Sequence, residues 1–183
     1  MVVGAADEFQ AHLSVSKIDS EGNILWVKSY TNENYIWDAE VVQSSDGSLI
    51  IGASTIQVNS ANVAWILNLS DSGDVIWEKS FSQGYGTQIW SIIELRNSDI
   101  VFVGLNEEYY NSRALLVKLS HTGDLLLSKE YFPDNEIDYS WMFTAVRETK
   151  DGGLIIMGGK GCVWDSCEER GSWLLKTDNE GNF

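Results

Sequence analysis

Apolar runs of about five to eight residues alternate with short polar segments along the whole chain. In one stretch the runs span residues 90–95, 100–105, 113–119 and 125–132, and the segments between them are rich in Asn, Asp, Gly and Ser. Short runs rich in Val, Ile and aromatic residues that end at such turn formers are typical of antiparallel strands joined by hairpins. No segment keeps the helical period of 3.6 residues over three turns. The pattern therefore predicts an all-β fold.

A turn motif recurs four times along the chain, and its glycines are 51, 50 and 58 residues apart. Two further markers keep nearly the same period: a tryptophan at residues 37, 90 and 141, and an apolar stretch that ends in glycine at residues 52, 104 and 158. The segment Val2-Val3-Gly4 is similar to a truncated first copy of that stretch. Three markers with one period indicate an internal repeat. The turn motifs begin at Lys17, Asn68, Lys118 and Lys176.

Four short strands in a repeat of about 50 residues are typical of a β-propeller blade. We therefore expect one propeller-like domain over residues 1–183, with blades at about 1–32 (partial), 33–83, 84–134 and 135–183 (partial). This division gives about three and a half blades, a partial or open propeller. A β-sandwich with coincidental spacing is the alternative. Because a closed ring needs at least four blades, we expect a piece of a longer propeller or an open arc, which a homodimer would close into a ring.

The recurring turn has a mechanical role. Glycine takes the positive φ of a tight turn without steric cost, and the Asp or Ser three residues before it caps the backbone N–H groups of the turn. Acidic turns also suggest calcium, but each loop supplies only about two carboxylates where Ca²⁺ takes six to eight oxygens. We therefore expect a structural turn and no metal site.

The motif resembles the tryptophan-docking repeat of quinoprotein-type propellers. Asp19, Gly22 and Trp26 match that repeat, as do Thr122 and Gly123, while Ser70, Gly73 and Trp77 form the second copy and Leu127 takes the Trp position in the third. The broader pattern is also similar to repeats of prokaryotic, often extracellular propellers, some of which carry lectin-like labels. The resemblance implies rings that pack between neighbouring blades. The resemblance is specific evidence for the architecture but weak evidence for any activity, because the matching residues are those that build blades.

The charge balance narrows the classes of binding partner that the chain could have. The chain has 12 Lys and Arg against 27 Asp and Glu, a net charge of −15. This argues against nucleic acid, whose binding depends on Lys and Arg that neutralise phosphates, and against an anionic membrane surface. No apolar run approaches the length of a membrane span. We expect no cofactor, no membrane insertion, and an extracellular or cell-surface location.

Aromatic residues at the start of each predicted inner strand are the candidate ligand site. These strands would line the central channel, so the rings of Trp37, Trp90 and Trp141 would lie at equivalent heights near its mouth and could stack on sugars. The alternative is that the three rings pack between blades, as large recurring rings usually do. The neighbouring loops add four further candidates: Tyr35, Asp38, Tyr85 and Tyr139.

Two cysteines, Cys162 and Cys167, fall in one loop of the longest repeat. Their spacing favours a small disulfide ring, which points to an oxidising compartment. Free thiols and, less so, a metal site are the alternatives, since zinc would need two further ligands. The segment Asn68-Leu69-Ser70 matches a glycosylation acceptor, but it lies at a predicted strand end and we discount it.

Catalytic motifs are missing from the sequence. It contains no G-x-S-x-G, no Walker A and no G-x-G-x-x-G pattern. We therefore expect a binding or scaffold module without catalytic activity, whose ligand is a glycan or a protein. The alternative is a fragment of a propeller enzyme, either a glycoside hydrolase or a quinoprotein-like enzyme. A purely structural arc of a larger surface protein is a third hypothesis.

Overall fold

The computed structural model describes residues 2–5, 12–56, 61–109, 111–132, 139–162 and 171–183. These residues form β-strands and no helix, which confirms the all-β prediction. The strands are β1 (Val2–Ala5), β2 (His12–Ile18), β3 (Ile24–Thr31), β4 (Tyr35–Gln43), β5 (Leu49–Ile56), β6 (Asn62–Leu69), β7 (Val75–Phe81), β8 (Gly86–Glu94), β9 (Ile100–Glu107), β10 (Ser112–Leu119), β11 (Leu125–Tyr131), β12 (Tyr139–Glu148), β13 (Leu154–Cys162) and β14 (Gly171–Thr177).

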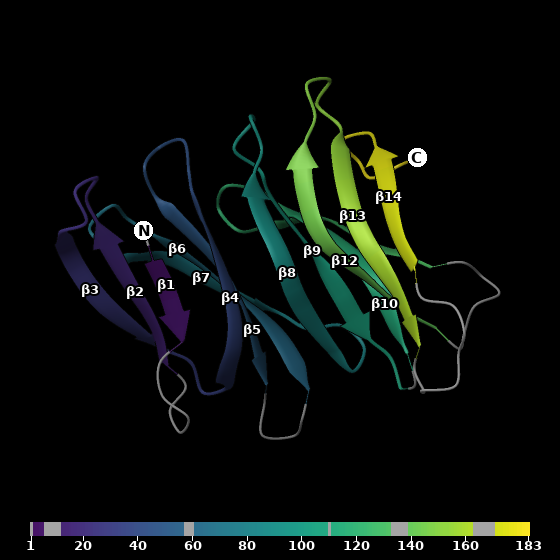
Figure 1. Ribbon diagram of the computed structural model, residues 1–183, viewed down its shortest axis with the longest axis horizontal. Coiled ribbons are helices and arrows are strands. Elements are labelled where there is room, and N and C mark those ends of the chain that lie inside the picture. The colour runs from purple at the N-terminus through teal and green to yellow at the C-terminus, as the bar shows by residue number, and fades with distance from the viewer. Residues whose placement is uncertain (1, 6–11, 57–60, 110, 133–138, 163–170) are drawn as a thin grey trace.

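The strands form antiparallel meanders that follow chain order (Figure 1). We call β1–β3 unit 1, β4–β7 unit 2, β8–β11 unit 3 and β12–β14 unit 4. Units 1 and 4 are separate three-stranded sheets. Units 2 and 3 belong to one eight-stranded sheet, but a single parallel bridge between Asn62 and Gly86 joins them. The basic element is therefore a meander of up to four strands.

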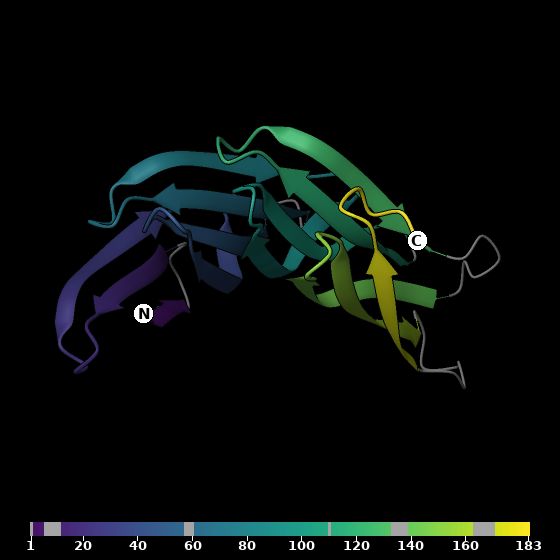
Figure 2. The same ribbon diagram turned by 90° about the horizontal axis from the view of Figure 1, so that it is seen from above.

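The four units follow one another along an arch, as Figure 2 shows. The first strands of units 2, 3 and 4 are neighbours, since β4 lies against β8 and β8 lies against β12. The last strands β3, β7 and β11 are the most exposed, with burial only at isolated positions. Each unit thus has an inner edge, made by its first strand, and an outer edge, made by its last.

The hydrophobic core consists of three layers, one between each pair of neighbouring units. Consecutive residues of β5 show how the layers arise. Leu49 and Ile51 pack against unit 1, whereas Ile50, which points to the opposite face, packs against unit 3. The middle strands β5, β6 and β9 are therefore buried on both faces. This explains their continuous apolar sequences.

A strand whose sheet packs against another described unit on only one face has alternating exposure. In β14 exposed and partly buried residues alternate, and Leu174 on its open face is 65% exposed. The contrast with fully buried β6 shows that stacking between units, and not the antiparallel sheet itself, determines how apolar a strand is.

One predicted boundary was wrong. The first strand of unit 3 begins at Gly86, four residues before the predicted start at residue 90. The polar residues at its start pair in register, Gly86 with Glu107 and Thr87 with Asn106. Thr87 is 2% exposed, and its hydroxyl donates to the side chain of Asn106 at 2.8 Å. Paired polar side chains thus extend a strand that hydrophobicity alone would begin later.

Candidate functional site

Two of the predicted site residues, Trp37 and Trp90, meet at the inner edges of units 2 and 3. Their ring centroids are 6.0 Å apart and the rings cross at 71°. Each tryptophan is the extra residue of a β-bulge, because the register shifts between Ile36 and Asp38 and again between Ile89 and Ser91. A bulge re-aims a side chain. Both indoles are partly buried, and neither buried indole N–H has a hydrogen-bond partner among the described residues.

Trp141 does not share this position. It pairs in register with Lys160, and the bulge of β12 falls at the residue between Phe143 and Ala145. Its ring lies 5.2 Å from that of Trp173 and is 8% exposed, inside the layer between units 3 and 4. The expected equivalent heights are therefore wrong, since the similar spacing of the three tryptophans hides a difference in register.

The remaining predicted site residues are dispersed. Tyr35 is exposed at the start of β4, and Tyr85 is exposed with its ring 5.7 Å from that of Tyr109. The ring of Tyr139 lies 3.8 Å from the ammonium of Lys160. Asp38 is partly buried and accepts a local bond from the backbone N–H of Ala39 at 3.0 Å. Only Asp38 and Tyr35 share a strand with Trp37.

The repeated tryptophans of the outer strands hold neighbouring units together. The indole N–H of Trp26 donates to the carbonyl of Asp71 at 3.1 Å, and that of Trp77 donates to the carbonyl of His121, also at 3.1 Å. Each accepting carbonyl lies in a turn of the next unit. The expectation that these rings lie between units is therefore confirmed, and we call this contact the outer clasp.

A tyrosine four residues later adds a second bond to the clasp. The hydroxyl of Tyr30 donates to the carbonyl of Gly73, and that of Tyr131 donates to Gly181, both at 2.6 Å. Burial, together with the nearby charge of Asp178, raises the pKa of Tyr131 to about 12. The phenol therefore remains a donor throughout the physiological pH range.

The recurring turns are capped as the sequence predicts. The Asp19 carboxylate accepts the backbone N–H groups of Glu21 at 2.9 Å and Asn23 at 2.8 Å, and the side chain of Asn23 and these bonds lower its pKa. The hydroxyl of Ser70 takes the same role by accepting the N–H of Asp74 at 3.0 Å. These side chains therefore shape turns, as expected.

A second contact holds the units at the opposite end of each first strand. Glu94 at the end of β8 accepts the backbone N–H of Ser45 at 2.8 Å and the hydroxyl of Ser44 at 2.5 Å. In the next unit Glu148 accepts the backbone N–H of Arg96 at 3.0 Å and pairs with its guanidinium at 3.1 Å. At each of the two junctions, a glutamate at the end of one unit's first strand thus anchors the first turn of the preceding unit.

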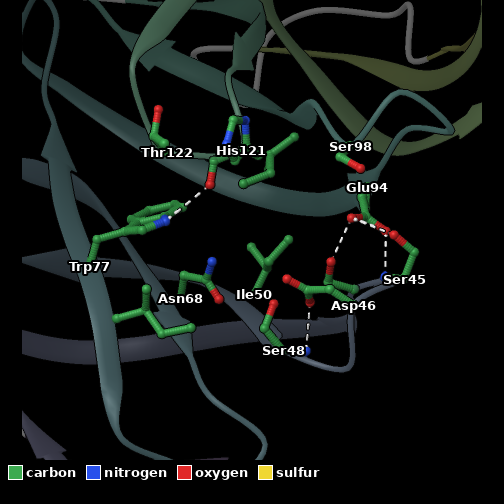
Figure 3. Close-up of a pocket in the computed structure, with 13 residues that line it drawn as sticks. Ser45, Asp46, Ser48, Ile50, Asn68, Trp77, Glu94, Ser98, His121 and Thr122 are labelled. Atoms are coloured by element: carbon green, nitrogen blue, oxygen red, sulfur yellow. Dashed lines mark hydrogen bonds between the residues drawn. The ribbon is translucent and has the colours of Figure 1, made fainter.

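A cavity of about 260 Å³ lies at the junction of units 2 and 3, between the outer clasp of Trp77 and the contact of Glu94 with the preceding turn (Figure 3). Trp77 forms one wall, the turn with His121 and Thr122 another, and Glu94 lies opposite Trp77. Ile50 and Asn68 form the floor. The cavity therefore joins an apolar floor and an aromatic wall to a carboxylate-bearing rim.

Asn68 is the residue of this cavity that the sequence interpretation overlooked. It is 7% exposed, and none of the described residues forms a hydrogen bond with its side-chain oxygen. A signal was available, because the other three copies of the turn motif begin with lysine. The burial of Asn68 also agrees with discounting it as a glycosylation acceptor, since a glycan needs an exposed side chain.

The predicted disulfide cannot be placed, because Cys167 and the side chain of Cys162 lie outside the described residues. Within the described ranges no group of three or more His, Cys, Asp or Glu side chains is arranged to hold a metal ion. In the same part of the chain no helix is long and apolar enough to cross a membrane.

The comparisons with known proteins give no family. No family model matches the chain, and no curated protein matches it.

Proposed function

We propose that the four units are β-propeller blades and that the chain is an arc of such blades which serves as a binding or scaffold module without catalytic activity. The observation that carries the proposal is the repeated clasp, in which an outer strand of one unit holds a turn of the next at successive junctions. Face-to-face stacking with the first strands gathered at an inner edge is the arrangement of propeller blades.

The inner edge supplies the best ligand site for such a module. Trp37 and Trp90 meet there in an edge-to-face contact, and Asp38 directly follows Trp37 in sequence. Aromatic rings offer flat apolar surface, and their polar neighbours can bond hydroxyl groups. A glycan, which has both apolar faces and hydroxyl groups, is the ligand that this combination fits best.

Glycan-array binding followed by tryptophan fluorescence titration tests this function. We expect a saturable response with at least one oligosaccharide, and a loss of at least tenfold in affinity in Trp37→Ala and in Trp90→Ala. Trp141→Phe is the matched control, because Trp141 packs between units 3 and 4 and phenylalanine keeps an aromatic ring there. No response across a broad panel, or equal loss in the control, would contradict the proposal.

A further inference from the structure

The cavity between units 2 and 3 is acidic. Among the described residues that line it are Asp46 and Glu94 but no Lys or Arg. Both oxygens of Glu94 already accept bonds from Ser44 and Ser45. Asp46 uses one oxygen to accept the backbone N–H of Ser48 at 2.8 Å, and its side chain is exposed at the rim. Asp46 therefore retains capacity for a further donor.

The floor of the cavity contains a buried acceptor without a donor. Asn68 is more than nine-tenths buried and projects into the cavity, and its side-chain oxygen has no hydrogen-bond partner in the part of the chain that the structure describes. A buried polar atom without a partner costs roughly 1–3 kcal/mol. A guest that donates hydrogen bonds would remove this cost.

The other copies of the motif show which chemical group is missing. Lys118 pairs with Asp99 at 3.3 Å and Lys176 with Asp151 at 3.0 Å, and both acids lie in the first turn of the same unit. Lys17 pairs with Asp71 of the next unit. At the equivalent position unit 2 has Asn68, so the turn carboxylate of Asp46 lacks the ammonium that its counterpart Asp151 has.

We propose that this cavity binds a primary alkylammonium group, which takes the place of the lysine that unit 2 lacks. An ammonium has three donors and no acceptor, which suits the free oxygen of Asn68 and the carboxylate of Asp46. The alkyl stem would lie against Ile50, Ile100 and the indole of Trp77, which line the same space. Cations are also attracted to the face of an indole ring.

The size of the cavity agrees with such a guest. Its volume of about 260 Å³ is several times the share of one water molecule, roughly 30 Å³ in the liquid. The proposal depends only on the junction of units 2 and 3, and not on the glycan site at the inner edge. Each can therefore fail without the other.

The same ammonium chemistry has two sources, a free alkylamine and the lysine side chain of a partner protein. Titration of the full chain with n-butylammonium chloride tests the shared chemistry, and Nα-acetyl-lysine amide tests the second source. The readouts are calorimetry and the NMR signal of the Asn68 side-chain amide. A pH of about 8 keeps the amine charged and an ordinary imidazole neutral. At matched ionic strength, n-butanol is the uncharged control.

We expect a saturable shift of the Asn68 amide with both amines and none with butanol. Tighter binding of the lysine derivative, by tenfold or more, assigns a protein lysine as the guest, and tighter binding of butylammonium assigns a free amine. No saturable shift with either amine, or an equal shift with butanol, would overturn the proposal, because the cavity then holds only water or any apolar guest.

Two variants and a matched control locate the site. Asn68→Lys places the lysine of the other units in the cavity and should abolish binding, and Asp46→Asn should weaken it between threefold and tenfold. Lys118→Asn makes the reverse exchange at the next junction, where Arg96 and Lys150 line the cleft, and should leave the affinity at Asn68 unchanged. Unaltered binding in Asn68→Lys and Asp46→Asn would also overturn the proposal.

Discussion

The junction of units 2 and 3 and the junction of units 3 and 4 share a glutamate contact but differ in the side chains that line their interiors. At both, a glutamate at the end of a first strand holds the preceding turn. At the second junction Lys118 pairs with Asp99 at 3.3 Å, and the cleft of about 310 Å³ beside it is also lined by Arg96 and Lys150. At the first junction the equivalent residue is Asn68, and the described residues that line its cavity of about 260 Å³ include no Lys or Arg. The comparison teaches that the backbone repeat builds a hollow at each of the two junctions, and that the side chains lining it decide whether the hollow contains a cation.

The outer clasp differs between the same two junctions in a complementary way. Trp77 donates to His121 across the first junction, where Phe81 occupies the tyrosine position and has no hydroxyl. Leu127 takes the tryptophan position at the second junction, where Tyr131 donates to Gly181 instead. Each junction thus keeps at least one side-chain hydrogen bond to the turn of the next unit.

The largest expected effect comes from removing the tryptophan of the first junction. Trp77→Ala should destabilise the protein by about 3 kcal/mol, at the low end for tryptophan because the ring is partly buried. Leu127→Ala at the second junction should cost about 1–2 kcal/mol, because the leucine has less apolar area and no bond to the turn. Urea unfolding followed by circular dichroism measures both. Equal losses would show that the clasp does not depend on the indole.

A methyl group on a turn glycine tests how closely the two units approach. Gly123 has a φ of +80°, and a Cβ there would lie 3.0 Å from the Trp77 ring. Gly123→Ala should therefore cost about 2–3 kcal/mol, from backbone strain plus overpacking.

Gly47→Ala is the matched control for that substitution. Gly47 has a φ of +91° and nothing within 4 Å of the added methyl group. This variant should lose only the strain, about 1 kcal/mol. If the two variants lose the same free energy of unfolding, the ring and the turn are not in tight contact.

Exchanging the residues that distinguish the two interiors should have a smaller effect. Lys118→Asn leaves Asp99 without its cation, and since both side chains are largely buried we expect a loss of about 1–2 kcal/mol. Asn68→Lys should not lower the free energy of unfolding and should raise it by less than about 1 kcal/mol, because Asp46, with which the new lysine would pair, is exposed. Chemical denaturation measures both, and a strongly destabilised Asn68→Lys would contradict the equivalence of the two positions.

The smallest expected effect concerns a turn that lines the cavity. Ser98 has a φ of +67°, where the equivalent turns have Gly47 at +91° and Gly152 at +84°. A non-glycine residue in this region is strained, so Ser98→Gly should stabilise the protein by about 1 kcal/mol. The melting temperature should rise by a few degrees, and a fall would show that the serine side chain makes a compensating contact.

The sequence predicted the features that depend on local chemistry. The strand at Ile100 and the capped turns at Asp19 and Ser70 follow from apolar runs and turn formers. The contact of Trp77 with the next unit followed from its place in the repeat. Each of these predictions depends only on a short segment of sequence and on the neighbouring copy of the repeat.

The candidate sites were harder to predict because they depend on register and on packing across junctions. Trp141 has nearly the same spacing as Trp37 and Trp90 but a different register, since the bulges fall at different residues. The cavity at Asn68 lacks the lysine of the other three copies, and the consequence appears only when five strands and three turns bring its lining residues together. Such a feature has no signature within one segment.

The pKa of Asp46 offers the most direct test that this junction is open to a cation. It is already lowered, chiefly because the carboxylate accepts the backbone N–H of Ser48. An ammonium bound in the cavity would favour the charged carboxylate and lower the pKa further. NMR titration of the Asp46 carboxyl carbon should show a lower value with saturating n-butylammonium than without it, and no such change in Asn68→Lys. A pKa of Asp46 that is identical with and without the amine would contradict the account.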